Sequence, residues 1–347
     1  MKNNFFIKAS LIILLILLPP LFIIYINDPG YMHTNFKSVN SSNSKEAIDR
    51  YIVPNLVRKT PHETVVIGNS LASELHTNFV NQKFKTVSLN ACQRGSQLYE
   101  QQNLIHHELK TNTKLKRIIW ILHNSILTEE NPNSIYSKKA YPWYLYSNNF
   151  IKNIYYFDAY ILSFCSEKDR SFTPADFNYY DMAFFNEKQN ISSDIFFNAP
   201  KTVSFINSLD PINPAYQNNL EQNIIKTINQ IPENIEVIFV FPPVRIRYFY
   251  HYNCSQYLNC QNFLVEELSQ KPNIHFVDYT IEDSISHKAD YFFDHIHYSP
   301  EIGKFMVENI DNPKYHITRE NKDSFNQVFL TQLNEFNKLT EEEIKNY

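Results

Sequence analysis

Five short apolar runs, separated by segments with helical character, constrain most strongly what this chain can fold into. They read ETVVIGNS (63–70), KTVSLNA (85–91), RIIWILHNS (117–125), EVIFVFPPV (236–244) and NIHFVDYT (273–280). Strands that are apolar along their whole length are buried on both faces, and strands that alternate with helices pair in parallel. The pattern therefore predicts an α/β protein whose parallel sheet is covered by helices on both sides.

Small and polar residues gather where these runs end. The set comprises Gly68, Asn69 and Ser70 after the first run, Gly95 after the second, Asn124 at the end of the third, and Asp294 and His297 after the fifth. The chain has only four glycines, and two of them belong to this set. Because the carboxyl ends of parallel strands meet at one edge of a sheet, where ligands bind, we expect these residues to lie close together.

Ser70, His297 and Asp294 have the side chains of an acyl-transfer triad. A serine hydroxyl becomes a nucleophile when a neighbouring imidazole takes its proton. An Asp three residues before the His can accept the Nδ1–H and hold the useful tautomer. The backbone N–H groups of Ser70 and Gly95 and the amide of Asn124 are candidate donors to an oxyanion. The structural alternative is that Ser70 is only the N-cap of a helix.

These ordered blocks resemble the SGNH (GDSL-like) hydrolase and acyltransferase superfamily, which carries Ser, Gly, Asn and Asp-x-x-His in this order. VVIGNS is similar to its first block, SLNACQRGS to the second, WILHN to the third and DHIHYSPEIG to the fifth. The resemblance covers about residues 62–125 and 234–312, and it is greatest for the membrane-anchored, exported branch. Asn69 stands where the family often has Asp, and the third block lacks the usual preceding glycine.

The resemblance implies a three-layer α/β/α sandwich, flavodoxin-like, with a five-stranded parallel sheet. It also implies a serine esterase or acyltransferase with Ser70, Asp294 and His297 as catalytic residues and with Ser70, Gly95 and Asn124 as oxyanion donors. Such an enzyme needs no metal and no organic cofactor. Members of this branch act in the acylation of surface polysaccharides or teichoic acids.

The N-terminus predicts one transmembrane helix before this domain. From Ala9 to Ile26 the chain has eighteen residues without a charge, which is about the minimum for a span. Apolar residues at 5–7 extend the predicted anchor to 5–26. No small-x-small cleavage site follows, which favours an uncleaved anchor over a signal peptide. Lys2 and Lys8 place the N-terminus in the cytoplasm and the domain outside, in a periplasm or at a cell surface.

The rest of the chain divides into three parts. We expect a membrane-proximal linker and helix at 27–60, the SGNH-like domain at 61–312 and a polar C-terminal extension at 313–347. The interval 126–215 is dense in aromatic residues and too long for a plain connection, so it is interpreted as an insertion over one edge of the site. The extension ends in LTEEEIKN, which predicts a solvated helix.

Two cysteines and two arginines complete the candidate residues. Cys254 and Cys260 bracket a short polar segment and could form a disulfide in an exported domain. Zinc binding by this pair with His251 lacks the usual ligand spacing. Arg245 and Arg247 follow the fourth apolar run and could contact an anionic substrate, although arginines are more often solvated or paired locally.

These observations predict a single-pass protein of the cytoplasmic membrane with an extracytoplasmic O-acyl esterase or O-acyltransferase domain. Its substrate would be a cell-envelope polysaccharide, and the family resemblance adds an acyl-donating membrane protein as a partner. A net charge of −4 without a long basic block argues against nucleic acid. The alternative is a catalytically inactive SGNH-like component that binds glycan or serves as a scaffold in an envelope assembly.

Overall fold

The computed structural model describes residues 49–128, 211–250, 254–294 and 296–338, with a few isolated positions between Phe6 and Phe22. Its centre is a five-stranded sheet with parallel pairing throughout and the order β2-β1-β3-β4-β5. The strands are β1 (Thr64–Ile67), β2 (Ser88–Asn90), β3 (Arg117–Ile121), β4 (Glu236–Phe241) and β5 (Ile274–Asp278). The predicted parallel sheet is confirmed, and each strand lies within one of the five apolar runs.

The strand order reverses between β1 and β3. From β1 the chain turns to β2 on one side and then crosses back to β3 on the other side. This is the order of flavodoxin-like doubly wound sheets, in which a ligand crevice forms beyond the carboxyl ends of the first and third strands. Val66 pairs with Asn90, and Ile67 pairs with Trp120. The segments after these three strands therefore leave the sheet at the same edge.

A row of stacked aromatic rings crosses one face of the sheet. Trp120, Phe239 and Phe276 occupy matching positions on β3, β4 and β5. Their ring centroids are 5.4 Å apart for the first pair and 5.0 Å for the second. The buried indole N–H of Trp120 donates to Gln101 Oε1 at 2.7 Å. The polar atom of the row is thus satisfied by a helix that covers this face.

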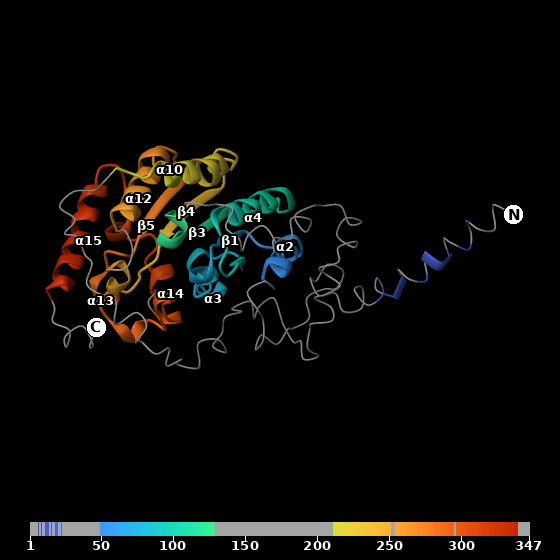
Figure 1. The fold of residues 1–347 in the computed structure, drawn as a ribbon, viewed down its shortest axis with the longest axis horizontal. Helices are drawn as coiled ribbons and strands as arrows, with labels where there is room; N and C mark the ends of the chain where they lie inside the picture. The colour runs from blue at the N-terminus through green and yellow to red at the C-terminus, as the bar shows by residue number, and fades with distance from the viewer. Residues whose placement is uncertain are drawn as a thin grey trace.

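Helices lie on both faces of the sheet (Figure 1). One layer contains α4 (Leu98–Thr111), α12 (Cys254–Leu268) and a third, continuous helix. The third helix is made of α10 (Pro214–Leu220), the π-helical turn η5 (Glu221–Ile225) and α11 (Lys226–Ile228). The helix α2 (Asp49–Lys59) packs against α4. The other layer contains α3 (Thr77–Phe84) and α14 (Pro300–Glu308), which contact each other. The short elements are η2 (Ser70–Ala72), α5 (Asn124–Leu127), η6 (Ile246–Tyr250), α13 (Asp283–Ser286), η7 (Ala289–Tyr291) and η8 (Pro313–Tyr315).

The last described helix, α15 (Lys322–Asn337), belongs to the core of the domain. Its buried apolar residues are Phe325, Phe329, Leu333 and Phe336. The Phe329 ring meets the Phe249 ring edge-on at a centroid distance of 4.7 Å. One side of this helix packs on η6 and α12, so this part of the predicted polar extension is joined to the folded domain. The segment for which a solvated helix is predicted, LTEEEIKN, lies outside the described residues.

Two predicted segments fall largely outside the description. Of the predicted anchor at 5–26 only isolated positions are described, and these are helical. None of the helices in the described ranges has the length and apolar character needed to cross a membrane. The linker at 27–48 and the interval 129–210, which holds nearly all of the predicted aromatic insertion, also lie outside the described residues.

Cys254 and Cys260 are free and buried, so the predicted disulfide between them is wrong. Both belong to α12, and six residues along a helix separate Cα atoms by about 9 Å, beyond the roughly 7 Å that a disulfide spans. The Sγ of Cys254 instead donates to the Phe249 carbonyl at 3.3 Å, and that of Cys260 to the Leu127 carbonyl at 3.5 Å. Burial raises the pKa of Cys260 to about 12. Both thiols thus have the properties of buried core side chains.

Candidate active site

Ser70 is the first residue of η2, the 3-10 turn that follows β1. The N-cap of this turn is Asn69, whose Oδ1 accepts the Leu71 N–H at 3.1 Å. Ser70 is therefore not the cap, and its hydroxyl makes a different contact. Gly68 leaves the space that this sharp turn needs, since a Cβ there would lie 2.9 Å from the Cβ of Ala72.

Asp294 and His297 lie in a tight turn between η7 and α14. The Oδ1 atom of Asp294 accepts the backbone N–H groups of Ile296 and His297, both at 2.8 Å. The Phe293 N–H donates to the His297 carbonyl, also at 2.8 Å. These bonds hold the turn closed and leave Oδ2 of Asp294 for the imidazole.

Ser70, His297 and Asp294 form a continuous hydrogen-bonded chain. His297 Nδ1 lies 2.6 Å from Asp294 Oδ2, and His297 Nε2 lies 2.8 Å from Ser70 Oγ. Because Nδ1 faces a carboxylate, the neutral ring carries its proton on Nδ1, and Nε2 accepts the bond from the serine hydroxyl. The structure thus brings together three predicted residues, of which Ser70 and His297 are 227 positions apart.

Two buried side chains attach the Ser70 turn to its surroundings. The hydroxyl of Tyr298 donates to the Leu71 carbonyl. Asn90, at the end of β2, donates its amide to the Ala72 carbonyl at 2.7 Å. The Ala72 carbonyl also accepts the Leu75 N–H at 3.3 Å, so Asn90 adds a second bond there. The two side chains thus tie the turn to β2 and to the segment that carries His297. Sequence reasoning gave neither residue a role, although Asn90 lies within the second predicted block and Tyr298 within the fifth.

Gly95 lies in the turn between β2 and α4 with φ of 60°. This is the left-handed region that glycine adopts at little cost. In the same loop, the Gln93 N–H donates to the Gly68 carbonyl at 3.0 Å. The candidate oxyanion turn is therefore attached directly to the end of β1, next to the serine turn.

Arg50, in the first turn of α2, fixes the Gly95 turn from outside the sheet. Its guanidinium donates to the carbonyls of Arg94 and Gly95 at 3.2 and 3.0 Å. It also pairs with the carboxylate of Glu100, with both side chains almost fully buried. Charge-assisted bonds of this kind are strong and directional. Arg50 is thus a positioning residue that sequence reasoning missed, because no local pattern links it to a turn 45 residues away.

His123 and Asn124 follow β3, and both are buried. His123 is the N-cap of α5, and its Nδ1 accepts the Ser125 N–H at 3.3 Å. In the part of the chain that the structure describes, neither His123 Nε2 nor Asn124 Nδ2 has a hydrogen-bond partner. A buried donor without an acceptor is unfavourable by about 1–3 kcal/mol. Both atoms are therefore available to bind an oxygen atom of a ligand.

The protonation of the site follows from burial and from neighbouring charges. Burial alone would raise the pKa of Asp294, but the hydrogen bond and the charge of His297 outweigh it and lower that pKa to about 2. Burial, together with repulsion from His297, lowers the pKa of His123 to about 3, against an opposing effect of Asp294. Near neutral pH Asp294 is therefore a carboxylate and His123 is uncharged.

The lowered pKa of Asp294 predicts how stability depends on pH. An unfolded Asp titrates near pKa ~3.9, so between about pH 4 and pH 2 the unfolded chain binds the proton more readily than the folded one. The stabilisation is fully present above about pH 4 and is lost as the pH falls through about 2. We expect urea unfolding of Asp294→Asn to show a smaller loss of stability over this range than the wild type. Equal slopes in both proteins would contradict the assignment.

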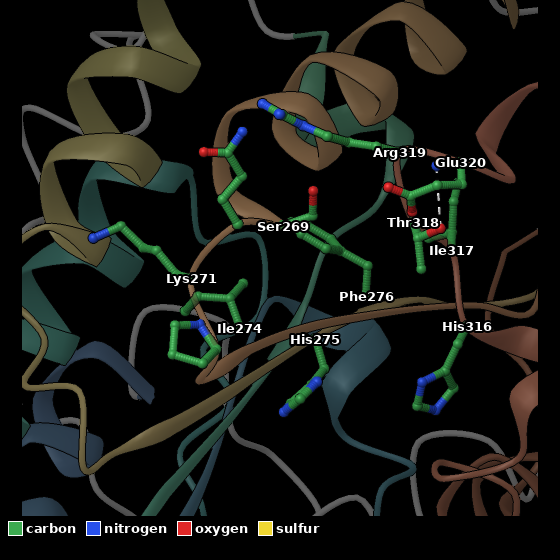
Figure 2. Close-up of a pocket in the computed structure, with 12 residues that line it drawn as sticks. Ser269, Lys271, Ile274, His275, Phe276, His316, Ile317, Thr318, Arg319 and Glu320 are labelled. Carbon is green, nitrogen blue, oxygen red and sulfur yellow. Dashed lines mark hydrogen bonds between the residues drawn. The ribbon is translucent and has the colours of Figure 1, made fainter.

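A cavity of about 480 Å³ lies at the amino end of β5, away from the carboxyl edge that carries Ser70 (Figure 2). Its lining includes Lys271, His275, His316 and Arg319. Arg319 donates to the Glu266 carbonyl at 2.8 Å, and His316 Nε2 lies 3.0 Å from the Ile310 carbonyl. The cavity contains none of the predicted site residues. Within the described ranges, no group of three or more His, Cys, Asp or Glu side chains is arranged to hold a metal ion.

The fold and the site together define an α/β protein with a Ser-His-Asp arrangement at the carboxyl edge of a doubly wound sheet. No protein-family model matches the chain, and no curated protein matches it. The geometry of Ser70, His297 and Asp294 is consequently the main basis for assigning a function.

Proposed function

We propose that this protein is a membrane-anchored, extracytoplasmic serine O-acyl esterase or O-acyltransferase of the SGNH type that acts on a cell-envelope polysaccharide. The observation that carries the proposal is the hydrogen-bonded chain from Ser70 Oγ through His297 to Asp294, with distances of 2.8 and 2.6 Å. A serine that only caps a helix, or a histidine that only begins one, needs no such series of hydrogen bonds. A serine that acts as a nucleophile needs it, because a base must take its proton.

The chemistry follows from these contacts. Ser70 Oγ attacks the acyl carbon of an ester while His297 Nε2 takes the hydroxyl proton. Asp294 stabilises the imidazolium that forms. Collapse of the tetrahedral intermediate releases the sugar or donor hydroxyl, which receives the proton from His297, and leaves the acyl group on Ser70. Water or a second hydroxyl then attacks in the reverse sequence, which gives hydrolysis or acyl transfer.

The developing oxyanion needs donors that are in place before the reaction. The N–H of Ser70, the N–H of Gly95 and the side-chain amide of Asn124 are proposed for this role. Two observations support it: the attachment of the Gly95 turn to the end of β1 and the unpartnered, buried Asn124 Nδ2. The described residues need no metal or organic cofactor for any of these steps.

The proposed membrane location rests on the N-terminal segment. The described large apolar side chains there are half or more exposed to solvent, namely Phe6, Leu11, Ile12, Ile13, Leu15, Leu18 and Phe22. A run of exposed apolar side chains favours burial in lipid. The segment with Lys2 and Lys8 would remain cytoplasmic, which places the acyl-transfer domain on the outer side near a polymer substrate and an acyl-donating membrane protein.

Covalent labelling tests the proposal. The full-length protein in detergent is treated with a serine-directed fluorophosphonate probe, and labelling is followed in the wild type, Ser70→Ala and His297→Ala. We expect the wild type to label and both variants to lose labelling, because the probe reacts only with an activated serine.

Ser284→Ala serves as the matched control, since this serine is exposed and lies outside the site. It should label like the wild type. A folded wild type that does not label would overturn the enzymatic proposal. The catalytically inactive component that binds glycan or serves as a scaffold would then be the better account.

A further inference from the structure

Arg245 is a half-buried cation at the candidate active site, and none of the described residues is its partner. It follows β4 at the carboxyl edge of the sheet, between the ends of β3 and β5. Within the described part of the chain its guanidinium makes no hydrogen bond and no ion pair. Burial lowers its pKa, and the Asp294 carboxylate is close enough to oppose that effect. A guanidinium has five N–H donors, and a half-buried arginine that uses none of them for a hydrogen bond within the protein is unusual.

Asp294 is not the partner that Arg245 lacks. Its Oδ1 accepts two backbone N–H groups, and its Oδ2 accepts the His297 ring. Three of the roughly four acceptor positions of this carboxylate are therefore used by the turn and the triad, and no hydrogen bond or ion pair joins it to Arg245 within the described residues. The charge of Arg245 remains available to a group from outside the protein.

His123 follows β3, the neighbour of β4, and has a second donor without a partner among the described residues. Because its Nδ1 accepts the Ser125 N–H, the neutral ring carries its proton on Nε2. That Nε2–H is buried and has no acceptor among the residues that the structure describes. The ring stays uncharged near His297, so it offers a hydrogen bond without adding a second cation beside the triad.

Tyr248 contacts both Arg245 and His123. Its backbone N–H donates to the Arg245 carbonyl at 2.8 Å. Its ring packs on the His123 ring with a centroid distance of 5.1 Å. One residue of η6 thus contacts both the Arg245 backbone and the His123 ring.

We propose that Arg245 and His123 form an anion-binding subsite beside the Ser70–His297–Asp294 chain, and that the acylated substrate carries a carboxylate or phosphate group that occupies it. The inference rests on the proposed acyl-transfer function and adds the charge of the substrate. A guanidinium together with a neutral N–H donor suits an anionic oxygen pair, which accepts both bonds and balances the charge. A neutral acyl carbonyl would leave the Arg245 charge unbalanced.

Protection of Ser70 from the fluorophosphonate probe tests the subsite without requiring turnover. The labelling rate of the full-length protein is measured with galacturonate against galactose, and with glycerol 3-phosphate against glycerol. Each pair differs mainly in the anionic group, and the two pairs separate a carboxylate source from a phosphate source. We expect at least one anion to slow labelling at a concentration at least tenfold lower than its neutral counterpart, and this difference should shrink as salt is added.

The variants locate the effect. Arg245→Gln and His123→Asn should each raise the anion concentration needed for protection several-fold or more. Arg245→Gln removes the positive charge. His123→Asn keeps an acceptor near the Nδ1 position but loses the donor at the Nε2 position. His123→Gln, which restores a distal N–H, should recover part of the protection. Arg319→Gln, at the far cavity, is the matched arginine control and should protect like the wild type.

The outcomes separate this inference from the function on which it rests. Labelling that neither anion slows more than its neutral counterpart overturns the subsite and leaves the activated serine in place. Protection that survives Arg245→Gln also overturns it. A wild type that does not label overturns the proposed function and the subsite together.

Discussion

Replacing Asp294 with Asn is expected to lower kcat for p-nitrophenyl acetate by about 10⁴-fold with little change in KM. The physical reason lies in how the side chain is held. Oδ1 accepts two backbone N–H groups, and an Asn in the same position would keep its carbonyl oxygen there. Its NH₂ group would then face His297 Nδ1 and donate to it. The ring would carry its proton on Nε2, which could no longer accept the Ser70 proton.

The measurement is steady-state hydrolysis by the wild type, Asp294→Asn and a matched control, Asp290→Asn. Asp290 is exposed, lies four residues earlier in η7 and undergoes the same chemical change. It should keep the wild-type kcat. A thermal melt checks that Asp294→Asn remains folded, as the retained Oδ1 bonds predict. If Asp294→Asn kept kcat within about tenfold of the wild type, Asp294 would not act as the residue that orients His297.

The sheet and the triad could be predicted from sequence because both depend on strong local signals. The strand inside each of the five apolar runs is buried over all or nearly all of its length, and alternation with helices leaves a parallel sheet as the simple solution. Once the strands are parallel, topology alone sends Ser70 and the Asp294–His297 turn to one edge. The three-residue spacing of Asp294 and His297 then allows one short turn to align them.

Other features could not be predicted because they depend on packing between distant elements. Arg50 reaches the Gly95 turn only because α2 packs on α4, where the Glu100 carboxylate is buried. A lone His123 gave no sign that its Nε2–H would be left without an acceptor. The burial of α15 could have been predicted, since Phe325, Phe329 and Leu333 recur every four residues and indicate an apolar helix face. The charged residues at the end of the chain favoured a solvated helix instead.

Replacing Gly303 with Ala is expected to destabilise the fold by about 3 kcal/mol, or roughly 10 °C in Tm. A Cβ built on Gly303 would lie 2.0 Å from the backbone oxygen of Glu74 and 2.8 Å from its carbonyl carbon. Neither atom belongs to a flexible side chain, so α14 would have to move away from the segment after Ser70. Replacing glycine with alanine inside a helix normally stabilises a protein by about 1 kcal/mol. The steric cost at Gly303 must therefore be larger than this stabilisation, so that the net effect on the free energy of unfolding is a loss.

Activity should fall with stability in this variant, because α14 begins three residues after His297 and its approach to Glu74 helps to set the distance between His297 and Ser70. Chemical unfolding and the fluorophosphonate labelling rate measure the two effects separately. Lys304→Ala, at the exposed neighbouring position of the same helix, should change stability by no more than about 0.5 kcal/mol. A neutral or stabilising Gly303→Ala would mean that α14 does not approach Glu74 this closely. The alignment of His297 with Ser70 would then have to depend on the Tyr298 and Asn90 bonds alone.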